Sequence, residues 1–272
     1  MLQSDLHAES RGEILDTGLS AAEEELFLIN PARATMRAFV ETYQDLDDPP
    51  SVALFADGAP LKELVGDFLI ASTLADLVAD DVVSVRTLET VPRHSLLLTE
   101  AFLVSLIENG EHVCGLTTSE ESFVEETYAE YQTRWEAASS FSLRTPPISH
   151  IRETLGDEIG PEVAADFDSV LEILETARGD GDGLDEVTIA LLVAANNAEL
   201  LYDISRWGED IRLASKATFS RSKNRLEEAG LIDTEKVPID VGRPRLRLKL
   251  GEDELRSASI EAVAEETLDR LA

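Results

Sequence analysis

The segment Thr218–Ile232 reads TFSRSKNRLEEAGLI, and the segment Gly242–Leu250 reads GRPRLRLKL. The first has the pattern of a helix with small polar and basic outward positions, which we expect to stop at Gly230. The second alternates arginine or lysine with leucine, which predicts a strand with one basic and one buried face. A helix followed directly by such a hairpin is typical of the recognition end of a winged helix-turn-helix.

The charge around these segments differs from that of the rest of the chain. The 272 residues include 55 Asp and Glu but only 23 Lys and Arg, for a net charge of -32. Residues 206–250 instead hold 11 basic and 7 acidic side chains, a local excess of +4. A basic island in an acidic chain is expected of a surface that faces phosphate groups.

We therefore expect the island to bind double-stranded promoter DNA. Arg221 and Arg225 can each donate two hydrogen bonds to guanine, and Asn224 can pair with adenine. An arginine in the narrow Gly242–Arg245 segment suits the minor groove. The alternative is a solvated basic surface, or one that contacts protein. The complete set of candidate DNA-binding residues is Lys216, Thr218, Ser220, Arg221, Lys223, Asn224, Arg225, Arg243, Arg245 and Arg247.

Composition limits the remaining classes. The acidity is spread along the chain and only five residues are lysine, which favours a protein adapted to a high-salt cytoplasm. No apolar run approaches the ~20 residues that span a bilayer, and no secretory signal is evident, so we expect a cytoplasmic protein with no membrane partner. One cysteine excludes an intrachain disulfide. We find no motif for catalysis, metal or cofactor binding and expect no enzyme activity.

The first half predicts an α/β domain with a parallel sheet, because short apolar strands alternate with helices. We expect residues 1–20 to be frayed. The predicted strands are 51–56, 82–87 and 112–116. The predicted helices are 21–43 with an interruption near Asn30 and Pro31, 61–78, 96–108 and 120–138. The predicted domains are 1–147, a sensor-like α/β domain, 148–183, a helical connector and flexible linker, and 184–272, a winged helix-turn-helix with a C-terminal helix.

Two groups of small polar residues directly follow predicted strands. Ligands of open parallel sheets bind at that edge, and helix N-termini attract anions. We expect a small metabolite effector there, the alternative being that these residues only cap helices. The candidates are Asp57, Gly58, Thr117, Thr118 and Ser119.

The last predicted helix, 252–271, carries an apolar stripe that includes Ile260, Val263 and Leu268. Such a stripe can pack on its own domain or form a dimer seam. We favour the seam and expect a homodimer that reads a palindromic site.

The segments quoted at the start resemble archaeal winged helix-turn-helix proteins, and the whole chain resembles the TbsP-like haloarchaeal transcriptional regulators. It is also similar to the TrmB group of sugar-responsive regulators. The resemblance implies DNA-binding control of central carbon metabolism genes and a phospholipase D-like N-terminal domain. Two departures are evident. The DNA-binding domain comes last here and first in TrmB proteins, and His94, His112 and His150 lack the lysine of the His-x-Lys motif that hydrolysis requires.

The sequence thus predicts a sequence-specific regulator of carbon and glucose metabolism genes in a halophilic archaeon. Two alternatives stay open at this point. One is a small-molecule enzyme of the α/β half whose winged helix serves oligomerisation. The other is a scaffold whose winged helix binds protein.

Overall fold

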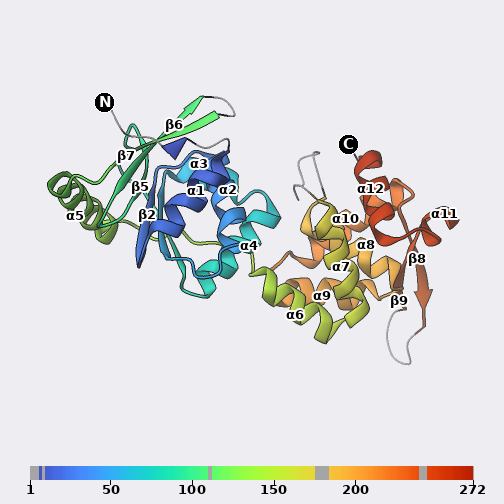
Figure 1. Cartoon of the computed structure of the whole chain (residues 1–272). Coiled ribbons are helices and arrows are strands. Elements are labelled where there is room, and N and C mark those ends of the chain that lie inside the picture. Colours follow the sequence, from blue (N-terminus) through green and yellow to red (C-terminus); the bar gives the residue numbers. More distant parts are fainter. Residues whose placement is uncertain (1–5, 8–9, 110–111, 175–183, 239–243, 272) are drawn as a thin grey trace. The chain divides into compact units, whose positions relative to one another are not determined.

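The computed structural model describes residues 6–7, 10–109, 112–174, 184–238 and 244–271. The chain forms two compact units (Figure 1). The first comprises Met1–Gly66 and Thr73–Leu143, and the second comprises Asp67–Ser72 and Arg144–Ala272.

The first unit is built on a seven-stranded sheet with the order β1-β7-β6-β5-β2-β3-β4. Only the pairs β2–β3 and β3–β4 are parallel, and the other four pairs are antiparallel. The sheet is therefore mixed, where we expected a parallel one. Its strands are β1 (Leu6–His7), β2 (Glu25–Ile29), β3 (Ser51–Ala56), β4 (Val83–Thr87), β5 (Ser95–Leu98), β6 (Leu103–Asn109) and β7 (His112–Thr118).

Helices cover both faces of this sheet (Figure 1). The helix α5 (Glu121–Ala137) crosses one face, where the Trp135 ring meets Phe27 and Phe55 edge-on at centroid distances of 5.7 and 5.4 Å. On the other face, Gly18 lets the backbone of one helix approach Leu97 closely. The helices of that side are α1 (Arg11–Ala21), α2 (Arg33–Gln44), α3 (Gly58–Leu64) and α4 (Phe68–Ala79).

Three segments of the first unit also differ from their predicted secondary structure. The part of the predicted helix 21–43 that precedes its interruption is not helical beyond Ala21, because β2 lies there between α1 and α2. Residues 96–108 contain β5 and β6. The turn between these last strands is closed by Thr99, whose Oγ1 accepts hydrogen bonds from the backbone N–H groups of Ala101 and Phe102. β2 and β5 are buried apolar runs, and such runs look alike in strands and helices. Residues 11–20 are not frayed but belong to α1, whose apolar side chains are buried.

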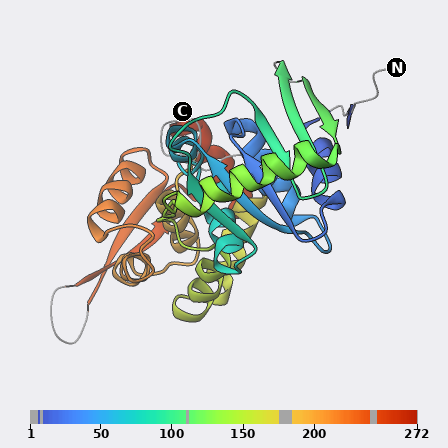
Figure 2. The same cartoon turned by 90° about the vertical axis from the view of Figure 1, so that its left-hand side faces the viewer.

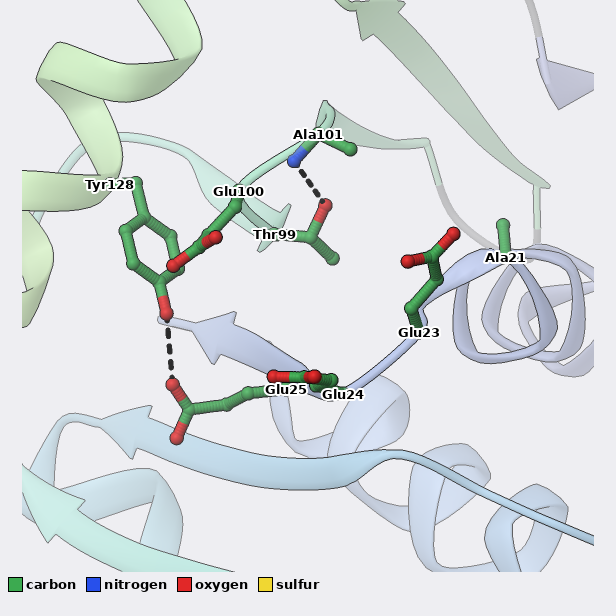
Figure 3. A pocket seen from close by; sticks show the side chains of 8 residues that line it. All are labelled: Ala21, Glu23, Glu24, Glu25, Thr99, Glu100, Ala101 and Tyr128. Carbon is green, nitrogen blue, oxygen red and sulfur yellow. Dashed lines mark hydrogen bonds between the residues drawn. The ribbon is translucent and has the colours of Figure 1, made fainter.

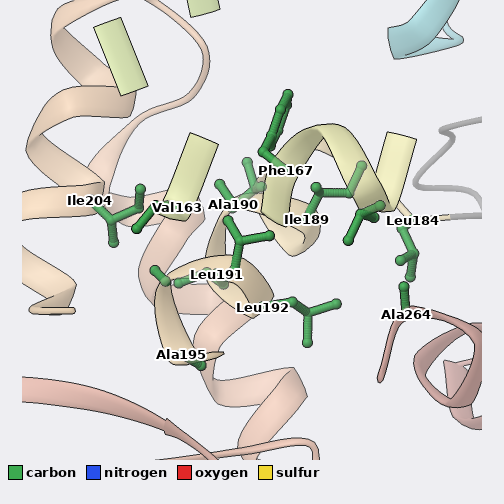
Figure 4. Close-up of a cluster of buried hydrophobic side chains, with 14 of the residues drawn as sticks. Val163, Phe167, Leu184, Ile189, Ala190, Leu191, Leu192, Ala195, Ile204 and Ala264 are labelled. Carbon is green, nitrogen blue, oxygen red and sulfur yellow. The ribbon is translucent and has the colours of Figure 1, made fainter. Parts of the chain in front are cut away.

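The second unit is organised around α8 (Glu186–Asn196), whose residues 187–195 are all buried (Figure 4). A helix that is apolar on every side requires neighbours on every side. The other elements of this unit are α6 (Ile148–Glu158), α7 (Pro161–Ile173), α9 (Leu201–Asp210), α10 (Lys216–Glu228), β8 (Ile232–Val237), β9 (Arg245–Leu250), α11 (Asp253–Arg256) and α12 (Ile260–Leu271). All of them except α6 and α11 pack directly against α8.

Two segments that we expected to lie outside this core belong to it. α6 and α7, which we expected to be a connector, contribute Leu155 and Phe167, and Trp207 Nε1 of α9 donates a hydrogen bond to Thr154 Oγ1 of α6. The apolar stripe of α12 is buried in the same cluster through Ile260 and Val263. The stripe therefore completes its own domain, which removes the reason to place a dimer seam there.

Candidate nucleic-acid interface

The second unit has the strand order of a winged helix. Leu200 forms a β-bridge with Arg247, and the backbone N–H of Leu248 donates to the carbonyl of Glu199 at 2.8 Å. β9 therefore lies between β8 and this short segment before α9. The chain order α8, short strand, α9, α10, β8, β9 places a two-stranded wing after the third helix, which is the recognition helix of such domains.

The turn between α9 and α10 brings the two helices into close contact. A Cβ on Gly208 would overlap the ring of Phe219, so only glycine fits there. Ser215 caps α10, because its side chain accepts a hydrogen bond from the backbone N–H of Thr218 at 3.2 Å. Lys216 Nζ lies 2.7 Å from the Glu209 carboxylate, and this pair ties the start of α10 to the end of α9.

α10 presents one polar face to solvent, as predicted. Ser220, Arg221, Asn224 and Arg225 are exposed, and their spacing of three and four residues puts them on one side of the helix. Phe219 and Leu226 are buried on the opposite side. Gly230 adopts the left-handed conformation, with φ of 73°, and ends the helix where the sequence predicted.

Lys223 does not share the exposed face. We expected an outward side chain, but only 11% of it is exposed, and its Nζ lies 2.7 Å from Glu227 Oε2. The other oxygen of Glu227 accepts a hydrogen bond from Thr234 Oγ1 of β8 at 2.9 Å. Lys223 and Glu227 therefore join α10 to the wing, and the lysine is turned away from the face we assigned to DNA.

Two of the three basic residues of β9, Arg245 and Lys249, have partners within the domain. The guanidinium of Arg245 lies 4.1 Å above the ring of Tyr202 and 3.3 Å from the Asp203 carboxylate. Lys249 pairs with Glu235 across the two strands. Arg247 buries its Nε, which lacks a hydrogen bond to any described residue. The wing does alternate basic and apolar residues, but its basic side is largely held by the protein. Arg243 lies outside the described residues.

The cations of the recognition surface thus differ in availability. Within the described ranges, Arg225 forms no ion pair, and Arg221 contacts only Thr218 Oγ1, at 3.3 Å. Lys216 keeps its charge, because its hydrogen bond to Glu209 raises the pKa of the ammonium group and lowers the pKa of the carboxyl group. Two unpaired guanidinium groups beside Asn224 and Ser220 can donate to base edges and phosphates.

The five candidate effector residues are not brought together. Asp57 and Gly58 follow β3, whereas Thr117 and Thr118 end β7, with Ser119 directly after it. β3 and β7 run in opposite directions, because three antiparallel pairings separate β7 from β2 and β3 lies parallel to β2. The two groups therefore point to opposite edges of the sheet. The cap of α5 is Glu120, which accepts from the Phe123 N–H, and not Ser119.

A pocket of about 270 Å³ lies elsewhere in the first unit (Figure 3). Its lining is strongly acidic, and the hydroxyl of Tyr128 donates a hydrogen bond to Glu25 at 3.0 Å. Burial raises the pKa of Tyr128, and the hydrogen bond to Glu25 raises it further. The lining comes from three distant segments, so no local pattern could have revealed it. It comprises Ala21, Glu23, Glu24, Glu25, Thr99, Glu100, Ala101 and Tyr128.

The described residues contain no group of three or more histidine, cysteine, aspartate or glutamate side chains placed to hold a metal ion. None of the helices in those ranges is long and apolar enough to cross a bilayer.

Comparison with known proteins places both units. The model of the TbsP-like transcriptional regulator N-terminal domain matches residues 3–146, and that of the C-terminal HTH domain matches residues 147–268. A search of curated proteins gives no match.

Two solved structures are similar at low identity. One is TrmBL2, described as an archaeal chromatin protein with a novel mode of DNA binding (12% identity, TM-score 0.36, 51% of this chain and 54% of that chain). The other is NucT from Helicobacter pylori (14% identity, TM-score 0.33, 48% of this chain and 91% of that chain). The match covers about half the length of the TrmBL2 chain. From the two family models, which together cover residues 3–268, the chain belongs to the TbsP-like transcriptional regulators, with an α/β N-terminal domain followed by a C-terminal helix-turn-helix domain.

Proposed function

We propose that this chain recognises specific sequences in double-stranded promoter DNA through the exposed face of α10. The observation that carries the proposal is the pair Arg221 and Arg225, which lie one helical turn apart, exposed and without a carboxylate partner in the described part of the chain. In a chain of net charge -32, unpaired cations on the recognition helix are the groups best placed to attract a polyanion. Asn224 lies between them on the same face.

The proposal divides by role the nine candidate residues that the structure describes, which leaves out Arg243. Arg221, Asn224 and Arg225 read base edges, while Lys216, Thr218 and Ser220 at the start of α10 contact phosphates. Arg245 supports the wing more than it binds DNA, since its guanidinium is engaged by Asp203 and Tyr202. Arg247 has a partly buried side chain, and we assign it a minor role in DNA binding. Lys223 does not contact DNA in this proposal; it stabilises α10 against the wing through its ion pair with Glu227.

We further propose that the regulated genes belong to carbon metabolism and that the cell is halophilic. The first point rests on the family resemblance, and the second on the excess of carboxylates and the scarcity of lysine. At molar salt the Debye length is only ~3 Å, so DNA binding depends on close contacts rather than on long-range attraction.

The first unit is the proposed sensor of a small metabolite. Asp57 with Gly58 and Thr117 with Thr118 and Ser119 remain two separate candidate sites. The pocket beside Tyr128 is a third, whose four glutamates favour a cationic ligand over a sugar phosphate. A thermal-shift comparison of glucose, sugar phosphates and organic amines separates these chemistries, because a ligand that binds the folded state raises the Tm.

Chromatin immunoprecipitation with sequencing, performed with and without glucose, tests the function as a whole. We expect the wild-type chain to occupy discrete promoter sites, with occupancy that changes with glucose. The variant Arg221→Ala/Arg225→Ala should lose these sites. The matched variant Arg37→Ala/Arg152→Ala removes two arginines from surface ion pairs elsewhere and should keep them. Loss of the sites in both variants, or in neither, contradicts the proposal.

A further inference from the structure

The hairpin of β6 and β7 leaves one side of its sheet uncovered. Ile107 pairs with Cys114, and Ser105 pairs with Leu116, so the four side chains lie on one face. It is the face toward α5, since Leu103 on the same side of β6 packs in the cluster that contains Val124 and Tyr131 of that helix.

Figure 2, seen from the α5 side, shows the two strands extending past that helix, so α5 does not cover their outer part. We name Ser105, Ile107, Cys114 and Leu116 the hairpin face. Its two largest side chains, Ile107 and Leu116, are 48% and 41% exposed.

The opposite side of the same hairpin is firmly packed. Glu108 accepts a hydrogen bond from Thr35 Oγ1 of α2 at 2.5 Å and lies 3.7 Å from the Arg11 guanidinium of α1. Val104 and Leu106, on the same side as Glu108, are buried. The hairpin is therefore held in place from behind while its outer face meets solvent.

The hairpin face carries no formal charge. Its members are one serine, one cysteine and two aliphatic residues, in a chain whose net charge is -32. Two copies of so acidic a chain repel each other wherever carboxylates meet. Two copies of the chain can bring neutral apolar faces together without placing carboxylates of one copy directly against those of the other.

The described surface offers few other apolar contacts of this kind. The exposed large hydrophobic residues are Val91, Ile107, Leu116, Phe123 and Tyr202. Tyr202, the one member in the second unit, is occupied by Arg245. The α12 stripe is buried. Among these exposed residues, Ile107 and Leu116 lie on neighbouring paired strands and on the same face of the sheet.

We propose that the hairpin face is the contact between two copies of this chain. A two-fold axis would pack one hairpin face against another, neutral on neutral, and place the two Cys114 side chains near each other. Each chain carries a single recognition helix, and two-fold pairing lets two such helices read a palindromic site. This last point rests on the proposed function; the exposed, neutral hairpin face does not.

The dimensions predict a weak dimer. A strand of seven residues is about 24 Å long, so a two-stranded face about 10 Å wide covers at most roughly 240 Å², and α5 covers part of it. This is well below the ~800 Å² per partner of a standard interface. The pairing therefore depends on protein concentration. Salt strengthens it, because at about 1 M the Debye length falls to ~3 Å and the repulsion between carboxylates is screened.

Sedimentation velocity of the full chain without DNA tests the contact. At about 1 M KCl we expect the wild-type mass to rise from monomer to dimer with concentration, and to rise less at low salt. Ile107→Lys should weaken the dimer at least tenfold. Val91→Lys is the matched control, because Val91 is 49% exposed in the same unit but lies outside the hairpin, and it should leave the dimer intact. A wild-type chain that stays monomeric, or an Ile107→Lys chain that dimerises as well as wild type, overturns the proposal.

Cross-linking gives a second readout that does not depend on the lysine variant. A short bismaleimide should join two chains through Cys114, the only cysteine, and the product should disappear in Cys114→Ser. Dimers in sedimentation that never cross-link would place the contact elsewhere and overturn the proposal. Failure of the proposed function is a separate result, in which the chain dimerises by these measurements but binds no promoter DNA.

Discussion

Replacing Arg225 by alanine should weaken the binding of the specific DNA site and narrow the difference between that site and other sequences. Arg225 is exposed on the polar face of α10 and forms no ion pair with a described residue. Its guanidinium can therefore donate to DNA without first leaving a carboxylate. Alanine keeps the helix, because it is the residue of highest helix propensity.

The expected loss follows from the contacts removed. A bidentate arginine–guanine pair contributes ~1–3 kcal/mol of discrimination, which is about 5- to 150-fold in affinity. Arg245→Ala makes the contrast. Arg245 is held by Asp203 and by the ring of Tyr202, and such exposed contacts are worth ~0.2–1 kcal/mol each. To bind DNA, Arg245 must first lose its contacts with Asp203 and Tyr202, which reduces its net contribution to the binding free energy. We therefore expect Arg245→Ala to cause a smaller loss of affinity, equal for all DNA sequences.

Fluorescence anisotropy with the specific duplex and a scrambled duplex, over a series of KCl concentrations, separates the two cases. Arg225→Ala should lower the ratio of the two affinities and leave the salt dependence nearly unchanged. A lost phosphate contact instead reduces the salt slope by ~1 and leaves the ratio intact. If Arg225→Ala keeps the wild-type ratio, the assignment of this face of α10 to base reading is refuted.

Three further predictions concern the frame around this face. Lys223→Met leaves the Glu227 carboxylate without its cation. Because that carboxylate is 29% exposed, we expect the free energy of unfolding to fall by about 1–2 kcal/mol rather than by the larger amount expected for a fully buried charge. The change is measured as a lower Tm and should vanish when Glu227→Gln is added. Gly208→Ala forces a methyl group into an aromatic ring of α10 and should cost ~1–3 kcal/mol, whereas Gly156→Ala, whose Cβ would meet its neighbour at 3.7 Å, should leave the Tm unchanged or raise it. Burial, and then the charge of the adjacent aspartate, raise the pKa of Glu186, so its charged form destabilises the fold above that raised pKa. Glu186→Gln should therefore raise the Tm at neutral pH. If the rise in Tm persists as the pH falls toward the ordinary pKa of 4.5, burial of the charged carboxylate is not its cause.

The α/β half shows where sequence patterns lose information. The strands predicted at 51–56 and 82–87 correspond to β3 and β4, because short runs rich in apolar residues mark strands of this kind. The segment of β5 and β6 was taken for a helix, since it is mostly apolar and the buried run Leu96–Leu98 of β5 shows no alternation that would mark a strand. Strand direction was beyond reach, so the two effector groups were expected at one edge.

For the second unit, the sequence by itself determined the winged helix, the polar face of α10 and the stop at Gly230, because helix period, strand alternation and glycine at positive φ are local properties. It also determined the excess of carboxylate, which needs no structure at all.

Only the tertiary structure decided which basic residues are free to act. Asp203 lies 42 positions before Arg245, yet their side chains meet, and Lys223 turns inward to a glutamate that also contacts β8. The physical reason is that the availability of a charge depends on its neighbours in space, and ion pairs between distant positions leave no mark in the local pattern.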